Sequence, residues 1–146
     1  MVIQIREADF DADYAALRRI RFDVFVEEQN VPESLEMDDR DPHCVHVLAF
    51  VDGEAVGTGR IDLKQGGKVG RLAVLAAARK LGVGSALMHR LHEVAAASGL
   101  SSVWCNAQVA AVAFYRRLGY EVVSEPFLEA GIEHVKMGRR IAPPTR

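Results

Sequence analysis

Two basic residues and two glycines stand where an expected strand, Lys68–Val74, gives way to an expected helix, and this combination suits phosphate binding. The first turn of a helix leaves backbone N–H groups unpaired and carries partial positive charge, so it attracts anions. Gly82 and Gly84 would let that backbone approach a phosphate closely, while Arg79 and Lys80 add full positive charge. From spacing alone, a phosphate site and an ordinary tight turn are equally good interpretations.

Two other phosphate-binding motifs do not fit this segment. The dinucleotide-binding pattern GxGxxG fails because Leu87 stands where the third glycine should be. The P-loop fails because neither Gly-Lys-Ser nor Gly-Lys-Thr occurs in the chain.

The histidines and cysteines do not have the spacing of a metal site. Three of them straddle the start of an expected strand, and two should lie on the polar side of the helix that follows Gly82. These residues are His43, Cys44 and His46, and His89 and His92. Cys105 lies within an expected strand, where burial is a better interpretation than nucleophilic catalysis. We therefore expect no metal ion.

The elements that must hold these residues follow from the hydrophobic pattern. Strands are expected at 2–7, 45–51, 55–63, 68–74, 102–107, 120–124 and 134–139, and helices at 9–27, 83–99 and 110–118. A loop, or a second short helix, should occupy 28–42. The order β-α-(α)-β-β-β-α-β-α-β-β is not a regular βαβ alternation, so the fold class is α/β of the mixed, α+β kind.

Composition limits the class of protein further. The 146 residues, 49% of them apolar, suit one domain, which we place at 1–141 with a flexible tail at 142–146. A net charge of −2 and a pI near 6.2 argue against nucleic-acid binding. No apolar run is long enough to span a membrane, and two isolated cysteines suit a reducing cytoplasm.

Five segments, in order along the chain, resemble one family. Residues 79–85, with the pattern R-x-x-G-x-G, resemble motif A of the GNAT acetyltransferase superfamily, and AFYRRLGY at 113–120 resembles its aromatic signature. RxxVFVxEQ at 21–29, NAQ at 106–108 and FLEAGIEH at 127–134 resemble the YjcF/ElaA-type branch of small bacterial acetyltransferases. The resemblance covers roughly residues 2–140.

This resemblance implies the GNAT-type acyl-CoA N-acyltransferase fold, a central mixed, mostly antiparallel sheet flanked by helices, with acetyl-coenzyme A as acyl donor. Backbone amides in the glycine turn should hold the pyrophosphate, and the pantetheine arm should pair with the fourth strand like an added strand. Asn106 and Phe114 should lie beside that arm. The residues expected to bind the coenzyme are Leu72, Ala73, Val74, Arg79, Lys80, Leu81, Gly82, Val83, Gly84, Ser85, Asn106, Phe114 and Tyr115.

Tyr115 is the residue for which the resemblance implies a chemical role. Aminolysis of a thioester expels a thiolate, which a phenol can protonate, although simple aromatic packing of a short helix is the alternative. A base must remove a proton from the attacking amine, and Glu28 and His134 are the candidates because both lie in branch-specific segments. Each has a structural alternative: Glu28 could pair with Arg21, and His134 could close its turn.

The expected function is direct transfer of an acetyl group from acetyl-coenzyme A to a primary amine, on a small molecule or a protein. The chain has no evident activated serine or cysteine nucleophile, so transfer should occur in a ternary complex, with a backbone N–H near Leu72 or Ala73 holding the oxyanion. The alternative is a non-catalytic acyl-coenzyme A sensor with the same fold.

The acceptor is less defined. Segment Glu27–Asp41 holds seven acidic residues and one arginine, a net charge of −6, and in this family it borders the acceptor site. Either it attracts a cationic amine, or it is a solvated acidic loop. Dimers are common in the superfamily, which leaves a homodimer and a monomer both open.

Overall fold

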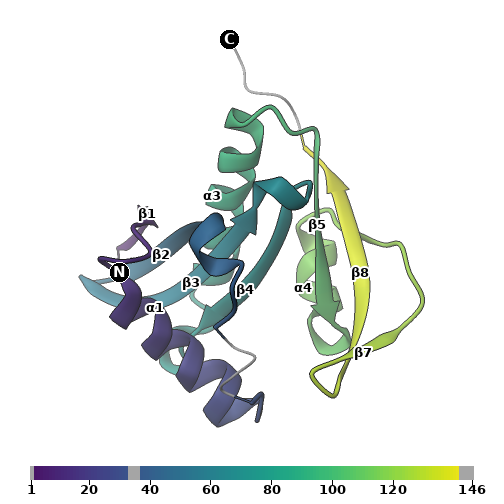
Figure 1. Cartoon of the computed structure of the whole chain (residues 1–146). Coiled ribbons are helices and arrows are strands. Elements are labelled where there is room, and N and C mark those ends of the chain that lie inside the picture. Colours follow the sequence, from purple (N-terminus) through teal and green to yellow (C-terminus); the bar gives the residue numbers. More distant parts are fainter. Residues whose placement is uncertain (1, 33–36, 142–146) are drawn as a thin grey trace.

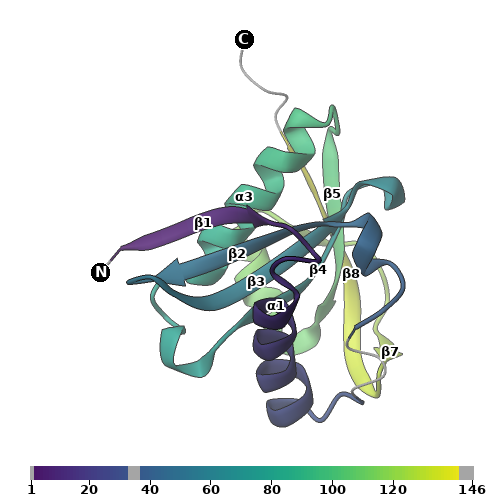
Figure 2. The ribbon, with the colours of Figure 1, turned by 60° about the vertical axis from the view of Figure 1, so that its left-hand side comes forward.

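The computed structural model describes residues 2–32 and 37–141, and within them eight strands form one mixed sheet (Figures 1 and 2). The strand order is β1-β2-β3-β4-β5-β8-β6, and β7 pairs with β8 outside this path. Every pair of neighbours is antiparallel except β4 and β5, which are parallel. The strands are β1 (Ile3–Ala8), β2 (Val45–Val51), β3 (Glu54–Asp62), β4 (Lys68–Val74), β5 (Ser102–Gln108), β6 (Glu121–Val122), β7 (Phe127–Glu129) and β8 (Ile132–Arg140).

Helices cover both faces of this sheet. On one face α1 (Tyr14–Arg21) runs into a π-helical segment, Phe22–Glu28, and on the other face lie α3 (Val83–Ala97) and α4 (Val112–Arg117) (Figure 2). Short 3₁₀ turns occur at Asp41–His43, Leu63–Gln65, Ala76–Ala78 and Val109–Ala111. No helix within the described ranges is long and apolar enough to cross a membrane.

Each face has its own apolar core. Leu17 and Ile20 of α1 are fully buried and pack with Leu48 and Ala73 of the sheet. Across the sheet, Leu87 and Leu91 of α3 are fully buried, in a larger cluster with Val47, Ile61 and Met137. The period-of-two pattern in the strands therefore places alternate residues in two different cores, which fixes the register of the central strands.

The two halves of the sheet meet at β4 and β5 and then separate. Between these two fully described strands the register contains one pair, Lys68 opposite Trp104, and Trp104 N–H donates to the Gly67 carbonyl at 3.1 Å. Beyond that pair the strands diverge toward their carboxyl ends (Figure 1). The facing edges of β4 and β5 are thus left without a partner strand along most of their length.

A β-bulge distorts β4 beside this separation. Thr58 pairs with Ala73 and Arg60 with Gly70, so that Gly59 of β3 faces both Arg71 and Leu72. Arg71 takes the left-handed conformation, with φ of 49°. A bulge interrupts the hydrogen-bond ladder and turns backbone groups out of the sheet plane.

Most of the expected elements are confirmed, and the differences are local. The helix expected at 9–27 begins at Tyr14, and the strand expected at 120–124 is only Glu121–Val122. Strand β7 was not expected, because three residues at an edge give no periodic signal. The tail predicted at 142–146 lies outside the described residues.

The prediction that His92 lies on the polar side of its helix is wrong. His92 is 8% exposed, and its Nε2 lies 2.6 Å from the Tyr120 hydroxyl, while Arg139 donates to its Nδ1 at 3.0 Å. These two hydrogen bonds satisfy the ring in the interior, which helical spacing alone does not reveal.

Candidate active site

A cavity of about 560 Å³ lies where β4 and β5 diverge. Leu72 of β4 and Asn106 of β5 line it, together with Phe114 and Tyr115 of α4 and His134 of β8. These five residues were all predicted from sequence to belong to the site, and the fold brings them together from four elements. Charged side chains complete the lining and are described below.

Tyr115 presents its hydroxyl to this cavity from a buried ring. The side chain is 8% exposed, with the rings of Phe114 and Tyr120 packed edge-on at centroid distances of 5.1 and 5.5 Å. The hydroxyl makes no hydrogen bond to any residue that the structure describes. Burial raises the pKa of Tyr115 far above its ordinary value, so the phenol keeps its proton at neutral pH.

His134 offers a basic nitrogen to the same cavity. Its Nδ1 lies 2.7 Å from the Ile132 carbonyl, which can only accept, so Nδ1 carries the hydrogen and the neutral ring has its lone pair on Nε2. That Nε2 lies 3.5 Å from Oε2 of Glu129, whose Oε1 is 3.5 Å from Nδ2 of Asn106. Glu129, which sequence reasoning missed, is therefore placed to stabilise a protonated His134 and to face a cationic ligand.

Gln29 and Gln108, which the sequence analysis did not single out, form a hydrogen bond at the cavity. Gln108 of β5 donates to Gln29 at 2.7 Å, and Gln29 ends the π-helical segment that follows α1. Both lay in segments that resemble the family, and that resemblance was the only signal for them. Their bond joins the segment that follows α1 to β5, and both residues line the cavity.

The glycine turn predicted to hold a pyrophosphate lies outside this cavity, at the start of α3. The first helical bond is from Ala86 N–H to the Gly82 carbonyl, and no described residue accepts from the amides of Val83, Gly84 or Ser85. Gly82 takes the left-handed conformation, with φ of 86°, immediately before the first residue of α3. Three unpaired amides at the end of a helix of 15 residues form an anion site of the expected kind.

Gly84 lies at a close contact between two helices. A Cβ there would lie 3.2 Å from two atoms of the Phe114 ring. The glycine therefore lets α3 approach α4 and sets the position of Phe114, which lines the cavity. The turn and the cavity are linked through this contact.

Arg79 and Glu28 form an ion pair instead of entering the cavity. Arg79 donates to Glu28 Oε1 at 2.7 Å and to the Val74 carbonyl at 3.0 Å. Glu28 thus pairs with Arg79, not with the Arg21 considered from sequence, and it is not among the cavity-lining residues. Among the other predicted coenzyme residues, Ala73 is buried in the core below α1, while Lys80 and Leu81 are exposed.

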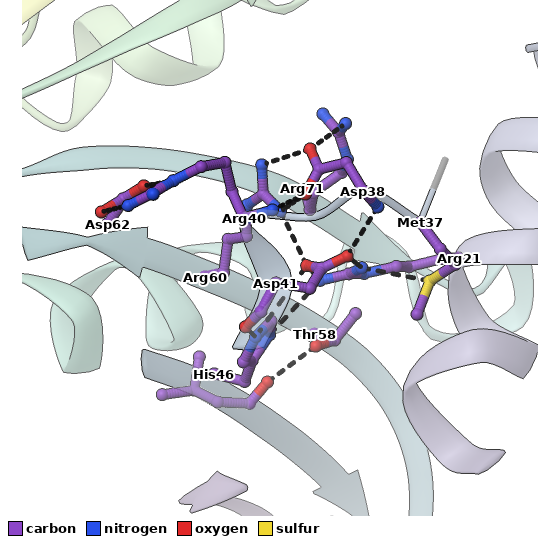
Figure 3. Close-up of polar contacts among 11 residues, drawn as sticks. Arg21, Met37, Asp38, Arg40, Asp41, His46, Thr58, Arg60, Asp62 and Arg71 are labelled. Carbon is purple, nitrogen blue, oxygen red and sulfur yellow. Dashed lines mark hydrogen bonds and ion pairs between the residues drawn. The ribbon is translucent and has the colours of Figure 1, made fainter. Parts of the chain in front are cut away.

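The acidic segment brings a buried ion-pair network to the other end of the cavity (Figure 3). Arg21 and Asp41, both fully buried, make two contacts of 3.0 Å with each other. Arg60 donates to Asp41 at 2.7 Å and to Asp38 at 2.7 and 3.0 Å, and Arg71 donates to Asp38 at 3.0 Å. Asp38, Arg60 and Arg71 line the cavity. Two carboxylates of this segment are therefore neutralised by arginines from distant elements; Glu33 and Glu36 lie outside the described residues.

These ion pairs shift the pKa values of both aspartates. Burial alone would raise the pKa of Asp38, but Arg60 and Arg71 outweigh it and hold that pKa at about 2. The pKa of Asp41 is also lowered, since Arg21 and Arg60 outweigh its burial. Both groups stay ionised at neutral pH. Among the described residues, no group of three or more His, Cys, Asp and Glu side chains could hold a metal ion.

Comparison with known proteins gives the family. Residues 9–141 match the family model described as the acetyltransferase (GNAT) domain. The uncharacterized N-acetyltransferase YjcF of Bacillus subtilis is 43% identical over 120 residues, covering 81% of this chain and 86% of YjcF. Protein ElaA of Escherichia coli is 33% identical over 132 residues, covering 86% of each chain.

Solved structures agree. The crystal structure of ElaA has a TM-score of 0.83 at 28% identity, covering 94% of this chain and 99% of ElaA. That of an acyl-CoA N-acyltransferase from Pseudomonas aeruginosa has a TM-score of 0.81 at 31% identity, covering 94% of this chain and 98% of that protein. The resemblance drawn from the motifs is confirmed, and so is the fold class. The chain belongs to the GNAT acetyltransferase family, with the acyl-CoA N-acyltransferase fold and with YjcF and ElaA among its relatives.

Proposed function

We propose that this protein transfers an acetyl group from acetyl-coenzyme A directly to a primary amine. One observation carries the proposal: the Tyr115 hydroxyl, protonated and without a protein partner among the described residues, faces a cavity between two diverging strands. A donor held there is available to a leaving thiolate. Family membership supports acyl transfer in general, and the side chains of this cavity support the transfer to an amine.

The unpaired edges and amides suit the donor substrate. The facing edge of β4, beyond Lys68, can pair with an amide-bearing pantetheine arm, in the way that a peptide adds to a sheet edge. The amides of Val83, Gly84 and Ser85 would hold the pyrophosphate. Phe114, which packs against Gly84, lies between these two regions and can contact the arm.

The proposed chemistry uses three groups of the cavity. His134 Nε2, directly or through a water, removes a proton from the amine as it attacks the thioester carbonyl, and Glu129 stabilises the imidazolium. A backbone N–H at the Arg71–Leu72 bulge donates to the oxyanion. The tetrahedral intermediate then collapses, the C–S bond breaks, and Tyr115 donates its proton to the sulfur. Because Glu28 is paired with Arg79 and does not line the cavity, we assign it to positioning the segment that follows α1 and assign the base to His134.

Tyr115→Phe tests this proposal. The change keeps the ring and its packing but removes the hydroxyl, so kcat should fall by about 100-fold or more with little change in coenzyme A affinity or melting temperature. A thioester with a more acidic thiol needs less protonation and should restore part of the lost rate. An unchanged kcat would remove Tyr115 as proton donor. A large loss without recovery would indicate a misplaced thioester.

A non-catalytic acyl-coenzyme A sensor with the same fold would bind the coenzyme and show no amine-dependent turnover.

The free thiols favour a reducing compartment such as the cytoplasm for either function. Cys44 and Cys105 are unpaired, and burial raises their pKa values to about 11 and about 12, so neither is an activated thiolate.

A further inference from the structure

The bulge in β4 holds one residue in a backbone conformation that its type disfavours. Arg71 has φ of 49°, in the left-handed region, where the Cβ of an L-residue crowds the following carbonyl oxygen. A residue with a Cβ stays there only when surrounding contacts hold it, and such residues cluster at functional sites. The contacts of Arg71 therefore bear on the geometry of the bulge, from which the proposed mechanism takes its oxyanion donor.

Asp38 binds arginines of both strands at this bulge (Figure 3). Arg71 donates to its Oδ2 at 3.0 Å, and Arg60 donates to its Oδ1 at 2.7 Å and to its Oδ2 at 3.0 Å. In the register, Arg60 of β3 pairs with Gly70, the residue immediately before Arg71. One carboxylate thus joins β3 to β4 at the point where the ladder between them is interrupted.

Asp38 is itself anchored. Its backbone N–H donates to Oδ2 of Asp41 at 3.0 Å, and Asp41 is fully buried against Arg21 of α1. The Asp38 and Arg71 side chains are 28% and 29% exposed, so water and salt screen their attraction less than that of a surface pair. The side chain of Arg71 is therefore bound by a carboxylate that the first helix helps to fix.

Leu72, the next residue of the bulge, is secured from the side of α3. Gly59 faces both Arg71 and Leu72, and a Cβ on this glycine would lie 3.2 Å from the Leu72 side chain and 3.2 Å from that of Leu91. The glycine therefore lets Leu72 pack with Leu91 in the larger apolar core. Two consecutive residues of the bulge are thus held differently, Leu72 by packing and Arg71 by an ion pair.

We propose that Asp38 is a positioning residue, which through the Arg71 side chain holds the bulge in the conformation that presents its backbone N–H to the oxyanion. This inference rests on the proposed function and adds a residue to it. Loss of a whole oxyanion donor costs about 100-fold to 1,000-fold in kcat, and a donor that is only misplaced loses part of that. Substrate binding need not change, because the donor acts on charge that develops in the transition state.

The test compares Asp38→Asn, Arg71→Ala and Arg71→Gly. Neither alanine nor glycine can bind Asp38, but glycine takes a positive φ without strain. The kcat for thiol release should therefore fall by about tenfold in Asp38→Asn and Arg71→Ala, and by only about threefold in Arg71→Gly. Added to Arg71→Gly, Asp38→Asn should cause no further loss, because the side chain through which it acts is already gone.

The assay uses acetyl-coenzyme A with whichever amine the wild-type protein acetylates fastest among ethanolamine, benzylamine and a lysine-containing peptide. The KM for that amine and the affinity for coenzyme A should stay within about twofold of wild type in Asp38→Asn. Asp13→Asn, which breaks the remote ion pair with Arg6, is the control and should keep the wild-type kcat. In nitrogen-15 NMR spectra, the amide signals of Arg71 and Leu72 should shift in Asp38→Asn.

Three results would overturn the inference while the proposed function stands: a wild-type kcat in Asp38→Asn, an equal loss in Arg71→Ala and Arg71→Gly, or a raised KM at unchanged kcat. The last result would place Asp38 in substrate binding. Coenzyme A binding by the wild-type protein with no thiol release to any amine would instead reject the proposed function and, with it, the catalytic effect of Asp38. The amide signals would still report whether Asp38 holds the bulge.

Discussion

Tyr115 of α4 and His134 of β8 line the same cavity, and their surroundings give them opposite tasks. Tyr115 is buried, which raises its pKa and keeps it a donor. His134 is fixed by the Ile132 carbonyl in the tautomer whose Nε2 can accept, with Glu129 beside that nitrogen. An acid and a base with separate environments are what direct aminolysis of a thioester requires.

His134→Gln should therefore lower kcat by about 100-fold while coenzyme A affinity stays unchanged, because the amide cannot take the proton. Glu129→Gln should give a smaller loss, since it removes only the charge that stabilises the imidazolium. His89→Gln, on the exposed face of α3, is the matched control and should behave as wild type. Stopped-flow measurement of thiol release separates these effects. Wild-type turnover in His134→Gln would assign the proton to water alone.

The proposed binding and activation of acetyl-coenzyme A depend on two elements, the turn before α3 and the bulge in β4. This turn could be predicted from the sequence, because glycines and basic residues at this spacing are typical of a helix start that can bind an anion. The bulge could not, because Arg71 has no sequence feature that signals a left-handed conformation. The contact between Gly84 and Phe114 was also hidden, since it joins two helices that are separate in sequence.

A pair of substitutions at Gly84 separates packing from anion binding. Gly84→Ala adds a methyl group 3.2 Å from the Phe114 ring, so it should lower the melting temperature and weaken coenzyme A binding only a few-fold. Gly84→Asp adds a negative charge at the helix N-terminus and should weaken binding by roughly tenfold or more beyond that. Equal coenzyme A affinity in the two Gly84 variants, by calorimetry, would exclude phosphate from this turn.

Periodicity and a single hairpin turn, Asp52-Gly53, were enough to predict the central strands and α3. Five residues that the motif signatures predict for the site line one cavity, because these signatures lie where elements end at the cleft. The ionic network could not be predicted, because its five charged residues come from α1, the 37–41 segment, β3 and β4. Counting the charge of residues 27–41 alone indicates an acidic loop, and it does not reveal that Asp38 and Asp41 of this segment pair with arginines of other elements.

Two buried polar clusters, one beneath each set of helices, make the whole molecule sensitive to acid. Below pH 6.5 the unfolded chain protonates His92, whereas burial and the Arg139 charge lower the native pKa to about 4, so stability should fall as the pH drops through that window. Asp38 and Asp41 have lowered native pKa values, so they contribute stability above about pH 4 that is lost as the pH falls toward about 2.

Urea unfolding at a series of pH values tests both parts. His92→Gln should flatten the fall between pH 6.5 and about 4, and the exposed His43→Gln should not. Asp41→Asn should destabilise the protein by about 3–5 kcal/mol at neutral pH, because it leaves Arg21 and Arg60 short of a buried partner. It should also reduce the loss below about pH 4. A pH profile of His92→Gln identical to that of wild type would show that the ring is not held neutral.

The most direct measurement of the central claim is thiol release by the wild-type protein from acetyl-coenzyme A, with and without an amine, together with mass spectrometry of the amine. The account predicts release that depends on the amine, saturates with it, and yields one acetylated amine for each thiol, without an acetylated protein intermediate. Saturable binding of acetyl-coenzyme A with no amine-dependent release, across a panel of primary amines that includes small molecules and peptides, would contradict it.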